Sequence, residues 1–201
     1  MRVGWDATHG EFIVDDYYYF SKLRTLVDSE VDCVYSFYKL ENYDVIVFNY
    51  PEVKFKLREI SRIKSWLKKG KTVVFASYYN NLDNVTGIIN SVLKKLGLEM
   101  RISSDVIVDE KNNDGDKMHP LAKYGDHVVV MPCSSSVVGG RAFVEGFTSA
   151  ECNNGSKCFA AYEEFGRGKV IVLGTCVFWD NYSIEKYDNR ILANDILNGK
   201  I

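Results

Sequence analysis

The feature that most constrains the fold is an alternation of short apolar runs with amphipathic stretches in the first half of the chain. Residues 45–48 form a continuous apolar run, typical of a central strand buried on both faces. Residues 55–69 then carry apolar side chains at helical spacing, and Gly70 stands where a helix end favours a left-handed residue. A second apolar run at 71–76 and a second helical pattern at 85–96 repeat this order. Repeated strand–helix–strand units predict an α/β fold with a mostly parallel sheet and helices on both faces.

The same periodicities predict the remaining elements. Strands are expected at 2–5, 31–37 and 170–173, and helices at 19–27 and 188–197. In the helix predicted over 55–69, the stripe expected to face the sheet consists of Leu57, Ile60, Ile63, Trp66 and Leu67. The basic residues between them are interpreted as a solvated face.

After Glu99 the pattern changes to short strand candidates with few helices between them. These candidates are residues 102, 106–108, 128–131, 142–144 and 159–162, so we expect a hairpin-rich insertion at about 100–165. Residues 111–117 read as a polar surface loop. A turn at 153–157 would place Cys152 and Cys158 opposite each other, which leaves a disulfide and free thiols as alternatives.

Composition limits the class of protein. With 201 residues and 46% hydrophobic residues, the chain is expected to form one domain over 1–201. A formal charge of −2 argues against a sequence-independent nucleic-acid binder. No apolar run approaches the ~20 residues of a membrane helix, and residues 1–6 lack a signal-peptide pattern, so a cytoplasmic protein that does not span a membrane is expected.

Several strings resemble one known superfamily. They are residues 6–11, 43–47, 66–71, 84–97, 105–109, 119–121 and 166–174. With the element order, they are similar to the class I glutamine amidotransferase-like superfamily. The branch concerned is its uncharacterised prokaryotic members, which are related to the amidotransferase-like domain of an intraflagellar-transport protein. The resemblance implies a flavodoxin-like three-layer α/β sandwich without the catalytic residues of working amidotransferases.

The residues themselves allow a test for that chemistry. A glutamine-hydrolysing member needs a cysteine on a tight strand-to-helix turn, a histidine base and an acid. The turn after Ala76 carries Ser77, Tyr78 and Tyr79 instead, and the histidines stand at 9, 119 and 127, away from the last strand. The triad is therefore absent, and no catalytic residue is assigned. A substitute pair of Ser77 and His9 in a hydrolase-like enzyme is kept as an alternative.

Ligands of open α/β sheets bind outside the carboxyl ends of the strands. The loops expected there carry polar and aromatic residues that suit a sugar or nucleoside, although packed loop tyrosines would give the same pattern, since the chain has 13 Tyr. The predicted ligand-binding residues are Asp6, His9, Glu11, Asn49, Tyr50, Ser77, Tyr78, Tyr79, Asn80, Cys176, Trp179 and Asp180, with Asn81, Thr175 and Asn181 beside them.

Other sites are less strongly indicated. No cofactor is expected and no metal site is assigned. As an alternative, Asp6, His9 and Glu11, with Asp15 or Asp16 as a further donor, could offer ligands to a divalent metal. Tyr17-Tyr18-Tyr19-Phe20 could stack on a ring, but on a helix only one or two of the four can face the same way. The sequence thus favours a non-catalytic domain that binds a small polar ligand or a protein partner, with a homodimer left open.

Overall fold

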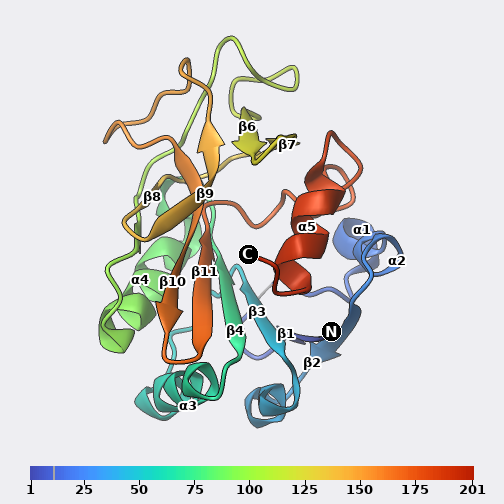
Figure 1. Cartoon of the computed structure of the whole chain (residues 1–201), viewed down its shortest axis with the longest axis vertical. Coiled ribbons are helices and arrows are strands. Elements are labelled where there is room, and N and C mark those ends of the chain that lie inside the picture. Colours follow the sequence, from blue (N-terminus) through green and yellow to red (C-terminus); the bar gives the residue numbers. More distant parts are fainter. Residues whose placement is uncertain (11) are drawn as a thin grey trace.

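The computed structural model describes residues 1–10 and 12–201. In this part of the chain, nine strands form one mixed sheet in the order β2-β1-β3-β4-β11-β10-β9-β6-β7 (Figure 1). Its parallel half consists of β2 (Glu30–Val34), β1 (Arg2–Asp6), β3 (Val45–Asn49), β4 (Thr72–Ala76) and β11 (Gly168–Leu173). Every residue of β3 and β4 is buried, as the continuous apolar runs predicted.

The remaining strands extend the sheet in antiparallel pairing. They are β10 (Cys158–Phe165), β9 (Arg141–Gly146), β6 (Leu121–Tyr124) and β7 (His127–Val130). The hairpin-rich stretch is therefore a continuation of the central sheet. A separate pair is formed by β5 (Arg101–Ile102) and β8 (Val137–Val138). Residues 106–108, expected as a strand, make only an isolated bridge between Val108 and Glu151.

Helices cover both faces of the parallel half. On one side lie α3 (Leu57–Lys68) and α4 (Val85–Leu96), and on the other α1 (Tyr17–Phe20), α2 (Leu23–Leu26) and α5 (Asn189–Leu197) (Figure 1). Two 3₁₀ segments, η1 (Phe37–Asn42) and η2 (Tyr79–Asn84), complete the connections. None of the helices in residues 1–10 and 12–201 is both long and apolar enough to cross a membrane.

Two helix predictions need correction. The single helix expected at 19–27 is two helices of four residues each. The helical hydrogen bonds are interrupted between them, where the Lys22 N–H and the Tyr18 carbonyl both bond to the side chain of Asn181. Leu57 does not face the sheet: it is 73% exposed, since Phe55, just before the helix, fills the core position and packs on Phe48 and Phe75. The strand expected at 31–37 also ends early, at Val34.

The outer edge of β7 is covered by side chains from the start of α5. Asp188 Oδ2 accepts from the Val128 N–H at 3.1 Å, and Asn189 Oδ1 accepts from the Val130 N–H at 2.8 Å. The Asp188 N–H donates to Val128 O at 2.9 Å and Asn189 Nδ2 to Val130 O at 3.0 Å. These four bonds satisfy backbone groups that an edge strand would otherwise present to solvent.

The five cysteines are free thiols. Cys152 and Cys158 do not face each other across a hairpin, because Cys158 pairs with Glu145 of β9 while Cys152 lies in the preceding loop. The Cys152 thiol donates to Ser156 O at 2.8 Å and the Cys158 thiol to Ala160 O at 3.3 Å. The disulfide left open by the sequence is therefore not formed in this structure.

Candidate ligand-binding cavity

A cavity of about 530 Å³ opens at the carboxyl ends of the parallel strands. Its walls include Phe12 after β1, Tyr50 after β3, Tyr78 after β4 and Val177 after β11. In the order β2-β1-β3-β4-β11, the connection from β1 leads to one side of the sheet and later connections lead to the other. The topological switch point therefore lies between β1 and β3, and doubly wound sheets bind ligands at such a point. The volume falls within the range of small-molecule sites, about 300–1,000 Å³.

Aromatic rings form much of the wall. The rings of Phe12 and Tyr50 stack with their centroids 4.6 Å apart and their planes inclined by 2°. Tyr50 holds a left-handed backbone, with φ of 67°, and its hydroxyl donates to Asp83 Oδ2 at 2.6 Å. The aromatic residues of the wall are Phe12, Tyr19, Phe20, Tyr50, Tyr78 and Tyr182.

Charged side chains interrupt this aromatic wall. Asp180 is only 6% exposed, and its Oδ1 accepts from the N–H groups of Tyr182 at 3.0 Å and Ser183 at 2.9 Å. Burial raises the pKa of the Asp180 carboxyl, which these hydrogen bonds and the nearby Lys186 ammonium partly offset. Asp114, from the polar loop at 111–117, forms an ion pair with Lys186. His119 also lines the cavity.

Cys133 contributes a thiol to the same wall and has a left-handed backbone, with φ of 48°. Burial raises the pKa of this thiol, and the hydrogen bond with Tyr78 offsets the rise only in part. Because the thiolate is the reactive form of cysteine, this environment does not activate Cys133 as a nucleophile.

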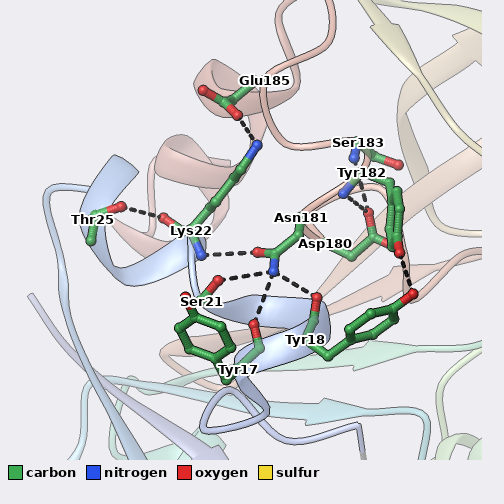
Figure 2. Close-up of polar contacts among 10 residues, drawn as sticks. All are labelled: Tyr17, Tyr18, Ser21, Lys22, Thr25, Asp180, Asn181, Tyr182, Ser183 and Glu185. Carbon is green, nitrogen blue, oxygen red and sulfur yellow. Dashed lines mark hydrogen bonds and ion pairs between the residues drawn. The ribbon is translucent and has the colours of Figure 1, made fainter.

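Asn181 joins α1 to the segment after β11, and Figure 2 shows its hydrogen bonds. Its Nδ2 donates to Tyr18 O at 2.7 Å, to Tyr17 O at 3.2 Å and to Ser21 Oγ at 2.9 Å. Its Oδ1 accepts from the Lys22 N–H at 2.9 Å. One amide thus satisfies the carbonyl end of α1 and joins it to the segment after β11.

Three of the predicted ligand-binding residues line this cavity: Tyr50, Tyr78 and Asp180. Most of the others are buried in packing, where each polar group finds a partner within the protein. Asn49, for example, donates to Phe12 O at 3.3 Å and accepts from Trp179 Nε1 at 3.2 Å. The predicted residues outside the lining are Asp6, His9, Asn49, Ser77, Tyr79, Asn80, Asn81, Thr175, Cys176, Trp179 and Asn181. Glu11 lies outside the described residues.

The alternative pair of Ser77 and His9 is not brought together. Ser77 is fully buried, and its Oγ lies 2.9 Å from Thr86 Oγ1 on α4. His9 Nδ1 lies 2.7 Å from Asp6 Oδ2, and His9 Nε2 lies 3.4 Å from Glu59 Oε2. The His9 ring also stacks on Phe55 with centroids 4.0 Å apart. Each side chain is therefore engaged with a different partner.

The alternative metal ligands serve local structure. Asp16 Oδ1 caps α1 by accepting from the N–H groups of Tyr18 and Tyr19, and Asp15 forms an ion pair with Arg24. Within residues 1–10 and 12–201, no three His, Cys, Asp or Glu side chains are grouped to hold a metal ion. Asp6 accepts from Thr8 as well as contacting His9.

Sequence reasoning missed most of the wall. Asp114 and Lys186 are 72 residues apart in the chain, and no local pattern links them. The sequence places Tyr19 and Phe20 in the aromatic string at 17–20 and on the sheet-facing side of the helix expected at 19–27. In the structure these two line the cavity, whereas Tyr17 and Tyr18 are 85% and 64% exposed.

The structure is an α/β domain with a cavity at the carboxyl ends of its parallel strands. Residues 25–197 match the family described as domain of unknown function DUF4350, and the chain belongs to this family. A curated relative from Aquifex aeolicus (strain VF5), described as an uncharacterized protein, is 36% identical over 221 residues. The match covers 98% of this chain and 93% of the relative.

Solved structures share the fold. The mmIFT52 N-terminal domain has a TM-score of 0.79 at 16% identity, over 98% of this chain and 97% of that chain. This similarity shows that the chain shares the fold of that domain. A β-galactosidase from Halorubrum lacusprofundi has a TM-score of 0.58 at 11% identity, over 98% of this chain and 30% of the enzyme. The cytoplasmic protein STM1381 from Salmonella typhimurium LT2 has a TM-score of 0.54 at 9% identity, over 99% of both chains.

Proposed function

We propose that the chain is a non-catalytic binding domain that holds a small polar ligand in the cavity at the carboxyl ends of β1, β3, β4 and β11. The observation that carries this proposal is the cavity of about 530 Å³ walled by aromatic rings and a few polar groups. Aromatic faces bury the flat side of a ring, and precisely placed polar groups fix its orientation. A sugar or a nucleoside-like molecule fits this combination.

The hydrolase-like alternative has less support. Ser77 and His9 are engaged with Thr86 and Asp6 respectively, and the Cys133 thiol is held in its unreactive protonated form by burial. Binding without turnover is therefore the function that the site favours. A protein partner, including a second copy of the chain, is the other outcome that the experiment below distinguishes.

We also propose the finer classification implied by the sequence resemblance: one amidotransferase-like domain over 1–201, with a flavodoxin-like three-layer sandwich and without the catalytic triad. The strand order of the parallel half, 2-1-3-4 followed by a fifth parallel strand, supports it. A cytoplasmic location agrees with five free thiols.

A thermal-shift screen against sugars and nucleosides tests the proposed function. A ligand at 100 times its dissociation constant should stabilise the fold by about 2.7 kcal/mol. Val177→Trp, which would place an indole in the cavity, should abolish the shift. Val138→Trp is the matched control, because Val138 is 47% exposed and lies outside the cavity lining. A shift that survives Val177→Trp would contradict the proposed site, and no shift with any compound would favour a protein partner.

A further inference from the structure

The charged side chains of the cavity wall indicate which chemical class of ligand it would bind. Its lining carries three carboxylates, on Asp83, Asp114 and Asp180, against one ammonium, on Lys186. Lys186 pairs with Asp114. Among the ion pairs of the described residues, none involves Asp83 or Asp180. Two carboxylates in the wall therefore form no ion pair in the part of the chain that the structure describes, although the Lys186 ammonium lies near enough to Asp180 to lower the pKa of its carboxyl.

These carboxylates share the cavity wall with electron-rich rings. Tyr50 donates its hydroxyl to Asp83, and Asp180 accepts from the backbone of Tyr182, so each acid is tied to a tyrosine of the wall. The face of a tyrosine ring attracts cations through its quadrupole. A carboxylate and an aromatic face next to each other act in the same direction on a positively charged group, and both disfavour an anion.

We propose that the ligand of this cavity carries an organic ammonium group, which lies against the tyrosine rings and is neutralised by Asp180 and Asp83. This inference rests on the proposed function, because it specifies the ligand of the same cavity. Asp180 is the stronger of the two determinants. Its carboxylate is largely withdrawn from water, so a bound cation replaces solvation that burial has already removed.

An organic cation fits the site better than a metal ion. No three potential ligating side chains are grouped around a common point in the described part of the chain. A metal ion would also gain nothing from the apolar surface of rings such as Phe12 and Phe20, whereas the carbon substituents of an alkylammonium ion or an amino sugar bury against them.

Isothermal titration calorimetry with choline and 3,3-dimethyl-1-butanol provides the test. These two compounds have the same shape, and a carbon in the alcohol replaces the quaternary nitrogen of choline. We expect choline to bind the full chain at least about tenfold more tightly than the alcohol, a difference of about 1.4 kcal/mol. D-glucosamine and D-glucose form a second matched pair, which compares an ammonium-bearing sugar with a neutral one.

Two variants test whether Asp180 and Asp83 recognise the positive charge of the ligand. Asp180→Asn should weaken choline binding about tenfold while leaving the affinity for the neutral alcohol unchanged. Asp83→Asn is the second variant. It keeps an acceptor for Tyr50, and asparagine tolerates the left-handed backbone of this position, where φ is 51°, so folding should be preserved. Asp126→Asn, an exposed position outside the cavity, is the control and should bind like the wild type.

The outcomes separate the two proposals. Equal binding of charged and neutral partners in both pairs would overturn the ammonium inference and leave the proposed function standing. Binding of a neutral sugar or nucleoside without any binding of the ammonium compounds would do the same. If no compound of either type binds, both proposals fail. If Asp180→Asn and Asp83→Asn both bind choline like the wild type, the ammonium group is not recognised in this cavity.

Discussion

The indole nitrogen of Trp179 donates a hydrogen bond to Asn49 Oδ1 at 3.2 Å, although the two residues are 130 positions apart in the chain. Both side chains are fully buried. The amide of Asn49 also donates to Phe12 O at 3.3 Å, so it connects the end of β3 with the segments that follow β1 and β11. These are three of the four strands whose loops surround the cavity.

Replacing the Asn49 side chain should destabilise the folded protein. Asn49→Ala removes one of two donors to Phe12 O, which keeps its bond from Trp5 Nε1 at 2.9 Å. It also removes one of two acceptors of Trp179 Nε1, which keeps its bond to Cys176 O at 3.1 Å. Because a hydrogen bond contributes about 0.5–1.5 kcal/mol, we expect the loss of two to lower the free energy of unfolding by about 1–3 kcal/mol. Urea unfolding followed by tryptophan fluorescence would measure it. An unchanged unfolding midpoint would contradict the structural role given to Asn49.

The buried contact between Asp6 and His9 gives a larger prediction. Asp6 is 0% exposed and His9 is 3% exposed, so a change at one side chain leaves the other in an interior without bulk water. Asp6→Ala removes the hydrogen bonds that this carboxyl group makes with Thr8 and His9. Because a hydrogen bond to a charged group contributes about 1.5–3 kcal/mol, the free energy of unfolding should fall by at least about 3 kcal/mol. Asp126→Ala, on the surface, should change it by less than about 0.5 kcal/mol. A small effect of Asp6→Ala would show that the contact with His9 contributes little to folding.

Gly174, directly after β11, lies against the backbone of a neighbouring loop. A Cβ at this position would come within 2.0 Å of Ser135 O and 2.4 Å of Ser134 Oγ. Because a backbone carbonyl cannot move aside easily, Gly174→Ala should cost at least about 3 kcal/mol. Gly97→Ala is the control: its Cβ would meet nothing within 4 Å, and only its left-handed φ of 83° opposes the change, at a cost of about 1 kcal/mol. Chemical denaturation of the two variants should separate these costs, and equal values would contradict the close approach at Gly174.

Asp180 should make stability depend on pH. Burial raises its pKa in the folded protein above the usual value of 3.8. The folded state therefore holds this proton more tightly than the unfolded state, so the contribution of Asp180 to stability falls as pH rises from about 4 through its folded pKa. Asp180→Asn cannot ionise, so relative to the wild type it should gain stability as pH rises through this interval. Urea unfolding of both proteins at pH 3 and pH 7, values that bracket the usual Asp pKa of about 3.9, would test the sign. A relative stability that does not change would contradict it.

The sequence predicted those parts of the fold that depend on local pattern. β3, α4 and the end of α3 at Gly70 follow from apolar periodicity and from a glycine that takes a positive φ, here 96°. Leu57 was misplaced because periodicity does not show that Phe55, which precedes the helix, takes the core position. The short helices at 17–26 depend in part on Asn181, a residue more than 150 positions away.

The candidate site was harder to predict, for a related reason. Loops that follow strands contain both buried packing residues and cavity residues, and sequence alone does not separate Asn49 from its neighbour Tyr50. Asn49 is buried against Trp179, whereas Tyr50, which takes a left-handed backbone, lies in the wall of the cavity. Asp114 belongs to the stretch at 111–117, which the sequence predicts as a surface loop. Its ion pair with Lys186 depends on the tertiary structure, which no local pattern reveals.

Asp188 and Asn189 also limit how copies of the chain can associate. Their side chains and the Asp188 N–H bond to the outward N–H and carbonyl groups of Val128 and Val130, so β7 offers no free hydrogen-bonding groups at these positions to a strand from another molecule. A homodimer built by joining two sheets into one would therefore use β2, at the opposite edge. The start of α5 thus closes the sheet at β7. Its removal would expose the hydrogen-bonding groups of a second edge strand, which could then pair with a strand of another molecule.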